Sequence, residues 1–121
     1  MKNNKPYIID VKSLKDIEKE IQKVGSDPKS IGIMAPKAIS KVIKLEDIFL
    51  QDAIIIKQDM LSIGGEVAVP KNTFELIKNT GDILIIGNLK QLHNLVVKLE
   101  RHYTRLKNIA KDLSLLLKDI K

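Results

Sequence analysis

The chain has 121 residues, of which 44% are hydrophobic and 30% are charged, and its formal net charge is +6. This length indicates a single domain, and the apolar fraction is large enough to bury a core, which excludes a disordered chain. The absence of cysteine excludes a disulfide framework and a thiolate metal site. No run approaches the roughly 18 apolar residues of a membrane span, and the charged N-terminus lacks the apolar segment of a signal peptide. We therefore expect a cytoplasmic protein with no membrane partner.

A basic balance often accompanies phosphate-bearing partners. The chain has only two tyrosines and two phenylalanines, however, and no tryptophan. These aromatic residues do not interleave with the lysines, so they form no platform on which the bases of a single strand could stack. No segment carries the dense basic stripe of a helix that enters a DNA groove. We expect no nucleic-acid partner, and a core built mostly from Ile, Leu and Val.

In chain order, the first predicted unit is a strand followed by a helix. Residues 7–11 are a β-type run, and Ser13 then caps a helix with Asp16 at the spacing of a capping box. The apolar residues of this helix recur at helical spacing and are expected to face inward: Leu14, Ile17, Ile21 and Val24. Residues 30–35 predict a second strand, which stops at Pro36 because proline cannot donate to a central ladder.

The middle of the chain holds an ambiguous segment and then a clear helix. Residues 39–45 fit either a helical turn or a short extra strand, and residues 48–50 fit a loop or the entry to a helix. Residues 51–63 predict a helix whose inward positions are Ala53, Ile56, Met60, Leu61 and Ile63. Two glycines then allow a tight reversal into a third strand over residues 66–69, which Pro70 closes.

The last third of the chain contains the strongest strand signal. Residues 73–78 predict a short helix with Phe74 and Ile77 inward. Residues 82–86 are almost continuously apolar, which is typical of a central parallel strand covered on both faces. A helix follows from Asn88, and its apolar positions are Leu89, Leu92, Val96 and Leu99.

A final helix from about Arg105 carries an apolar stripe to the end of the chain. Strands that alternate with helices favour a mainly parallel sheet joined by right-handed crossovers. We therefore predict one small α/β domain over residues 1–121. Its sheet is expected to be four-stranded and mainly parallel, flanked by helices, with the final helix at the C-terminus.

The predicted topology directs attention to one edge of the sheet. The carboxyl ends of parallel strands share one edge, and ligands bind there. Lysines follow the predicted strands closely and would gather on that rim: Lys12, Lys15, Lys37, Lys71 and Lys90. Backbone N–H groups at the helix starts would add to an anion site. The alternative is that lysine is so frequent in this chain that such a rim arises by chance.

Three turns have a more definite character than the rim as a whole. Pro36 fixes the backbone just before Lys37, and the double glycine before Glu66 lets the backbone approach a bound molecule. Lys90 lies at a helix N-terminus, where a cation is mildly unfavourable and an anion would relieve the conflict. The candidate ligand-binding residues are Lys37, Lys57, Gln58, Gly64, Gly65, Glu66, Asn88 and Lys90. The alternative is a plain helix-to-strand connector with solvated charges.

The sequence shows no standard catalytic or metal-binding pattern. His93 and His102 are nine residues apart on helical stretches, so they do not share a face, and no cysteine assists them. The serines lack a G-x-S-x-G elbow, and glycine-rich nucleotide motifs do not occur. Asp52 and Asp59 are expected to be solvated groups on a helix surface. We expect no metal and no cofactor, and the sequence identifies no catalytic residue.

Three blocks carry a resemblance to a known family: Ile-Met-Ala-Pro-Lys-Ala over residues 33–38, Lys-Gln-Asp-Met-Leu-Ser-Ile-Gly-Gly-Glu-Val-Ala-Val over residues 57–69, and Gly-Asn-Leu-Lys-Gln over residues 87–91. In this order and spacing they resemble the N-terminal domain that precedes the barrel in some bacterial and archaeal dihydropteroate synthases. The likeness covers nearly the whole chain. It implies folate or related pterin biosynthesis, in which the full transferase joins p-aminobenzoate to a hydroxymethyl-dihydropterin diphosphate and releases pyrophosphate.

The resemblance carries no catalytic residue onto this chain. The family's catalytic residues lie in a barrel of roughly 250 residues, which cannot fit in the sequence. The family's Asn-x-Thr-Pro-Asp-Ser-Phe motif does not occur either. We expect an accessory domain that docks on the barrel, in cis or in trans, through aliphatic surface, and that lacks synthase activity by itself.

Two other interpretations stay open. In the first, the chain is a self-sufficient ligand-binding or catalytic domain. Lys37, Lys57 and Lys90 then hold a phosphorylated small molecule, and Glu66 acts as general base. In the second, the chain is a homo-oligomerising module that pairs through its final helix.

Overall fold

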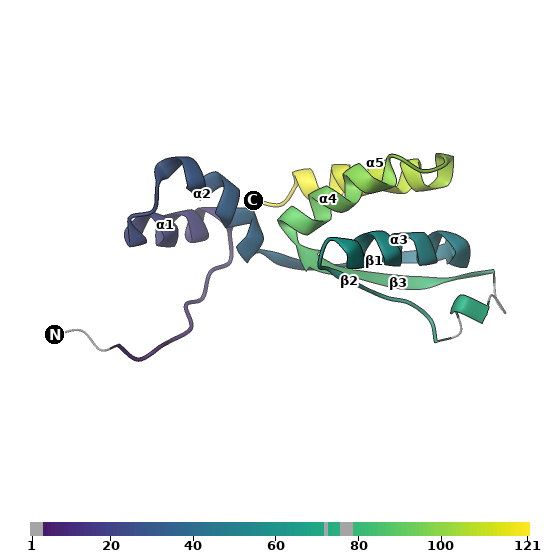
Figure 1. The fold of residues 1–121 in the computed structure, drawn as a ribbon, viewed down its shortest axis with the longest axis horizontal. Coiled ribbons are helices and arrows are strands. Elements are labelled where there is room, and N and C mark those ends of the chain that lie inside the picture. The colour runs from purple at the N-terminus through teal and green to yellow at the C-terminus, as the bar shows by residue number, and fades with distance from the viewer. Residues whose placement is uncertain (1–3, 72, 76–78) are drawn as a thin grey trace.

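The structure is a computed structural model that describes residues 4–71, 73–75 and 79–121. In chain order its elements are α1 (Leu14–Val24), α2 (Pro28–Met34), the 3-10 helix η1 (Ala35–Ala38), β1 (Ser40–Phe49), α3 (Leu50–Ser62), β2 (Glu66–Ala68), the 3-10 helix η2 (Thr73–Glu75), β3 (Thr80–Asn88), α4 (Leu89–Leu99) and α5 (Thr104–Lys118). Figure 1 shows the sheet with α3 directly over it, α4 and α5 beyond α3, and α1 and α2 at one end.

The described strands form one antiparallel sheet in the order β1-β3-β2, so the prediction of a mainly parallel four-stranded sheet is wrong. Both neighbours run antiparallel to β3, with Ser40 opposite Asn88 and Glu66 opposite Ile86. The strand-helix-strand order of β1, α3 and β2 does produce two parallel strands, since both run antiparallel to β3. They are not neighbours, however, because β3 inserts between them as in a split β-α-β unit.

The strands predicted over residues 7–11 and 30–35 are absent. The segment over residues 39–45, which the sequence left ambiguous, lies mostly in a strand. Residues 28–34 form α2 because Pro28 has a φ suited to the first helical turn and Asp27 Oδ1 accepts a hydrogen bond from Lys29 N at 3.0 Å. Residues 40–49 form β1, with a bulge between Leu45 and Ile48. At that bulge Asp47 has a φ of 53°.

The predicted strand over residues 7–11 is also absent. Residues 4–11, which we name the N-terminal arm, form no helix or strand, and Tyr7 and Ile8 are 85% and 97% exposed. Figure 1 shows the arm leading away from the sheet. The residue types of this run favour extended backbone, but no neighbouring strand pairs with it, so no hydrogen-bonded ladder forms.

The helices predicted at α1, α3, α4 and α5 are confirmed, and their inward faces make most of the core. Ser13 Oγ accepts a hydrogen bond from Asp16 N at 3.1 Å, so the predicted cap of α1 forms. α3 and α4 cover one face of the sheet, and α5 packs against α4. The core is aliphatic, as composition suggested; its largest fully buried apolar side chains are Ile56, Met60, Val67, Ile83, Ile85, Leu92, Leu95, Leu99 and Leu106.

Several inward assignments are wrong. Val24, Leu61 and Phe74 were expected to face inward but are exposed, at 82%, 48% and 62%. The helix predicted over residues 73–78 is described only as η2, and Ile77 lies outside the described residues. β3 is central, as predicted, but it is not covered on both faces. In the described part of the chain, no helix has the length and apolar character needed to cross a bilayer.

Candidate functional site

The sequence-predicted site residues lie at one end of the sheet, although the strands are not parallel. This end, which we name the glycine end, is where β1 begins at Ser40, β2 begins at Glu66 and β3 ends at Asn88. Gly64 and Gly65 immediately precede β2. In an antiparallel sheet the end of the central strand meets the starts of its neighbours. The juxtaposition expected from parallel strands therefore arises by a different route.

Lys57 and Glu66 form a hydrogen-bonded ion pair that ties α3 to β2. Lys57 Nζ lies 2.9 Å from Glu66 Oε1 and donates to the carbonyl of Val67 at 2.7 Å. Glu66 Oε1 also accepts the Val67 N–H at 2.7 Å. The hydrogen bond from Lys57, followed by that from Val67, lowers the pKa of Glu66 below its ordinary value. A carboxylate held ionised in this way is a weak general base at neutral pH, so the geometry favours a structural role.

The two glycine turns close on the same buried methionine. A Cβ on Gly65 would lie 2.3 Å from Met60 Cε, and a Cβ on Gly87 would lie 2.4 Å from the same atom. Gly64 has a φ of 92°, a left-handed conformation that glycine adopts without a steric penalty. Close packing of the α3–β2 and β3–α4 turns around Met60 therefore accounts for these glycines without a ligand.

The N-terminus of α4 is capped by the chain itself. Asn88 Oδ1 accepts the Gln91 N–H at 2.8 Å, and Gln91 Oε1 accepts the Asn88 N–H at 2.9 Å, so the predicted Asn88 cap is confirmed. The Leu89 N–H donates to the carbonyl of Ile39 at 2.9 Å. These bonds occupy N–H groups that a bound anion would otherwise use.

The lysines predicted to form one rim do not lie together: Lys12 precedes α1 and Lys15 lies within it, so neither follows a strand. Lys37 in η1 and Lys90 in α4 are exposed at the glycine end, as is Gln58 in α3. Lys71 follows β2 at the opposite end, so it does not belong to the same group. Within residues 4–71, 73–75 and 79–121, neither Lys37 nor Lys90 has a carboxylate at ion-pair distance, and both residues are exposed.

Sequence reasoning missed a polar cluster, centred on a buried carboxylate, that joins α3 to α5. Asp52, expected on the surface, is only 2% exposed. Arg105 donates through Nε to Asp52 Oδ2 at 2.8 Å and through Nη2 to Oδ1 at 2.9 Å, and the Tyr103 hydroxyl also donates to Oδ1. The Arg105 guanidinium lies 4.6 Å from the ring centroid of Phe49. The partners of Asp52 follow it by more than 50 residues, so no local spacing could have indicated them.

The cluster fixes the charge of its members. Burial by itself raises the pKa of Asp52, but the hydrogen bonds from Arg105 and Tyr103, together with the charge of Arg105, outweigh it, and the net pKa lies below the ordinary value. Burial, followed by the hydrogen bond to Asp52, raises the pKa of Tyr103. At neutral pH the cluster is therefore a carboxylate that accepts bonds from a cation and a neutral phenol.

A second polar contact lies close to the Asp52 cluster. His102 Nε2 lies 2.9 Å from Asp59 Oδ2, which connects the segment between α4 and α5 to α3. Asp52 and Asp59, both in α3, therefore each bind a residue of the segment that leads into α5. Among the described residues, no group of three or more His, Cys, Asp or Glu side chains is placed to hold a metal ion.

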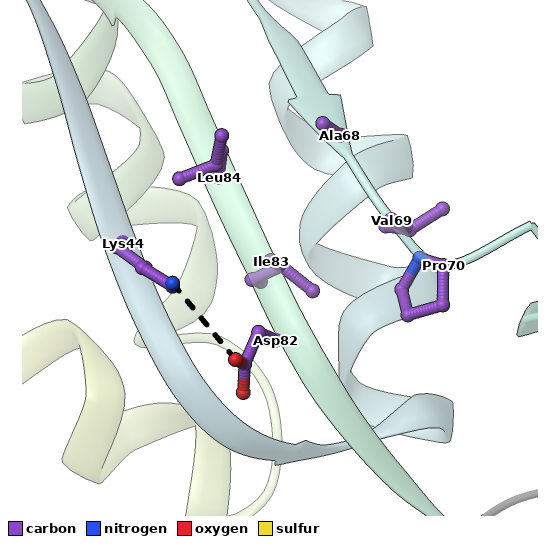
Figure 2. A pocket seen from close by; sticks show the side chains of 7 residues that line it. All are labelled: Lys44, Ala68, Val69, Pro70, Asp82, Ile83 and Leu84. Atoms are coloured by element: carbon purple, nitrogen blue, oxygen red, sulfur yellow. Dashed lines mark ion pairs between the residues drawn. The ribbon is translucent and has the colours of Figure 1, made fainter.

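The face of the sheet opposite the helices, which we name the open sheet face, carries exposed apolar side chains. Val42 is 62% exposed and Ile86 is 39% exposed, and the two are paired across β1 and β3. Beside them is a hollow of about 310 Å³ lined by Lys44, Ala68, Val69, Pro70, Asp82, Ile83 and Leu84. Figure 2 shows the side chains of Lys44 and Asp82 facing each other at its margin. Lys44 Nζ lies 4.0 Å from Asp82 Oδ2. Sequence reasoning missed this face because it expected the central strand to be covered on both sides.

Comparisons with known proteins give one informative likeness. The chain is 29% identical over 97 residues to a bifunctional dihydropteroate synthase/dihydropteroate reductase from Helicobacter pylori. The match covers 80% of this chain but spans only about a quarter of that relative, 26% of its length. No protein-family model matches the chain, and no solved structure matches it.

Proposed function

We propose that this chain is an accessory domain of a dihydropteroate synthase system in folate or related pterin biosynthesis. The observation that carries the proposal is the likeness to the bifunctional synthase/reductase over 80% of this chain. About three quarters of that relative lies outside the match. The partner that we propose is the corresponding catalytic barrel, attached in cis or bound in trans.

The contacts at the glycine end support an accessory role over a catalytic one. Lys57 and Glu66 hold each other and the backbone of β2. Asn88 and Gln91 cap α4. The hydrogen bonds from Lys57 and Val67 lower the pKa of Glu66, which makes its carboxylate a weak proton acceptor at neutral pH.

The open sheet face is the surface that we propose for docking on the barrel. Contiguous apolar side chains at a solvent-facing surface commonly mark protein contacts, and charged groups at the margin form the polar rim of such an interface. Val42, Leu84 and Ile86 form the apolar part here, and Lys44 and Asp82 lie at the margin. About three quarters of the relative lies outside the match. We propose that this portion contains the catalytic barrel and that the barrel binds the open sheet face.

Association with the synthase tests the proposal. The full chain is mixed with the dihydropteroate synthase of the same organism at about 50 µM each, a concentration that detects micromolar binding. Size-exclusion chromatography with light scattering is expected to show a complex whose mass equals the sum of the two proteins. Separate elution of both proteins at this concentration contradicts docking in trans. Docking in cis is examined separately, with a synthase whose own chain contains this domain in the same reading frame.

A second candidate function is anion binding at the glycine end. The observation that favours it is the placement of two exposed amines, Lys37 and Lys90, at the end where Gly65 turns the chain. We propose pyrophosphate as the probe, titrated against amide NMR shifts with sodium chloride of equal ionic strength as control. The amides of Lys37, Gly65 and Lys90 are expected to shift together. Scattered shifts across the surface would contradict the site.

A further inference from the structure

The hollow on the open sheet face lies beside one short side chain. Lys44 and Ala68 both lie opposite Leu84, on either side of it, so the three side chains share the outer face of the sheet. Ala68 contributes only a methyl group, which leaves space beside Leu84 where a longer residue would lie (Figure 2). We propose that this space receives one uncharged, apolar side chain of the synthase barrel. This contact rests on the proposed docking of the open sheet face and forms its centre.

The walls of the hollow favour an apolar occupant. Ala68, Val69, Pro70 and Leu84 supply aliphatic surface around a space of about 310 Å³. An apolar side chain that enters this space is removed from water together with the surface that it covers, which is favourable. Side chains that fill such a depression near the middle of an interface commonly carry much of the binding energy. We therefore expect this contact to dominate the affinity for the synthase.

The charges at the margin favour an occupant without charge. Among the described residues that line the hollow, the charged ones are Lys44 and Asp82, which have opposite signs. Lys44 Nζ lies 4.0 Å from Asp82 Oδ2, so the two charges largely offset each other. An incoming carboxylate or amine would lose hydration without gaining an unpaired counter-charge, whereas an apolar side chain avoids this loss.

The form of the hollow favours a side chain over a small molecule or an added strand. Lys44, Ala68, Pro70 and Asp82 are exposed, so the hollow is open to solvent, whereas small-molecule sites enclose most of their ligand. β2 ends at Ala68, and Pro70 has no N–H group, so a strand added along this wall would lack a donor there. A single side chain needs neither enclosure nor backbone donors.

Internal contacts hold two parts of the hollow in place before a partner binds. The Asp47 N–H donates to Asp82 Oδ1 at 3.1 Å, which fixes the acidic side of the margin. A Cβ on Gly81 would lie 2.8 Å from Pro70 Cγ, so the proline packs directly on the start of β3. Walls that are already ordered lose little conformational entropy on binding, which favours this position for the central contact.

Isothermal titration of the synthase with three forms of the full chain tests the contact. Beside the natural chain, Ala68→Leu fills the hollow, and Ala68→Ser is the matched control that leaves it open. Ala68 is exposed, so both variants are expected to stay folded, which circular dichroism and urea denaturation check. Ala68→Leu is expected to weaken synthase binding at least about tenfold, and Ala68→Ser by less than about threefold. Equal affinities of the two variants overturn the insertion.

Nuclear Overhauser spectroscopy on the complex identifies the occupant directly. The methyl groups of Ala68 and Leu84 in the isotope-labelled chain are expected to show contacts with aliphatic or aromatic side-chain protons of the unlabelled synthase. Contacts with the side chain of a charged residue overturn the proposal. The absence of contacts at both methyl positions, in a complex that does form, overturns it as well.

The outcomes separate this contact from the docking itself. If the natural chain binds the synthase and the two Ala68 variants bind equally well, the docking stands and the insertion is wrong. If the natural chain shows no binding at about 50 µM, docking in trans fails and this contact fails with it. Sedimentation equilibrium of the chain alone tests a second copy as occupant. A dimer that Ala68→Leu dissociates would overturn the synthase side chain.

Discussion

The two faces of the sheet are built from the same kinds of residue and have opposite surroundings. On the inner face Ile43, Val67 and Ile85 are buried beneath α3 and α4, whereas on the outer face Val42 and Ile86 are exposed. Neighbours along a strand thus differ in environment because alternate side chains point to opposite faces. The inner face stabilises the fold, and the outer face is available for association. The predictions below test this division, beginning with the largest effect.

A core substitution on the inner face is expected to have the largest effect. Ile85 is fully buried at the centre of β3, so Ile85→Ala removes apolar contacts and leaves a cavity. The free energy of unfolding should fall by about 4 kcal/mol. Urea denaturation followed by circular dichroism measures it, with Val97→Ala on the exposed side of α4 as the control. Equal stability of the two variants would show that β3 is not the central strand of the core.

The Asp52 cluster should contribute the next largest effect. Asp52→Ala leaves the Tyr103 hydroxyl and the Arg105 guanidinium without their acceptor. Because Arg105 is partly exposed and can turn to water, we expect a loss of about 2 kcal/mol, less than for a fully buried pair. Asp112→Ala, an exposed acid on α5, is the matched control and should change the unfolding free energy by less than about 0.5 kcal/mol. Equal effects of the two substitutions would contradict the burial of Asp52.

Acid should act on the same cluster. The pKa of Asp52 is lower in the folded chain than its ordinary value, so its contribution to stability is complete above the unfolded pKa of about 4 and is lost as the pH falls through the folded pKa. Stability measured at a series of pH values is expected to decline below about pH 4. The decline should be smaller in Asp52→Asn, where that carboxyl is missing. An identical dependence of stability on acid pH in both proteins would contradict the lowered pKa of Asp52 in the folded chain.

Local patterns were sufficient to predict α1, α3, α4, α5 and the strand at the centre of the sheet. Ser13 with Asp16, and the apolar spacing of α3 and α4, are signals contained within a few residues. Asp27 and Pro28 are also a local signal for the start of α2. The isoleucines that follow them favour a strand by propensity, so the segment was predicted as a strand.

The topology could not be predicted in the same way, because strand direction depends on how distant segments pair. The segment that forms β1 was ambiguous in the sequence, and nothing within residues 82–86 indicates that β3 pairs between β1 and β2 in the opposite direction. The same limit hid the pairing of Asp52 with Arg105. The glycine end was nevertheless located from sequence, since glycines that close tight turns lie at strand ends in either topology.

Docking through the open sheet face is tested by measuring the affinity of the synthase for two lysine variants of this chain. Ile86→Lys changes the open sheet face and Val97→Lys changes an exposed position on the helical side. Both variants should keep their unfolding free energy within about 0.5 kcal/mol of the natural chain. Isothermal titration is expected to show synthase binding weakened at least about tenfold by Ile86→Lys and unchanged by Val97→Lys. Equal affinities for the two variants would contradict the open sheet face as the docking surface.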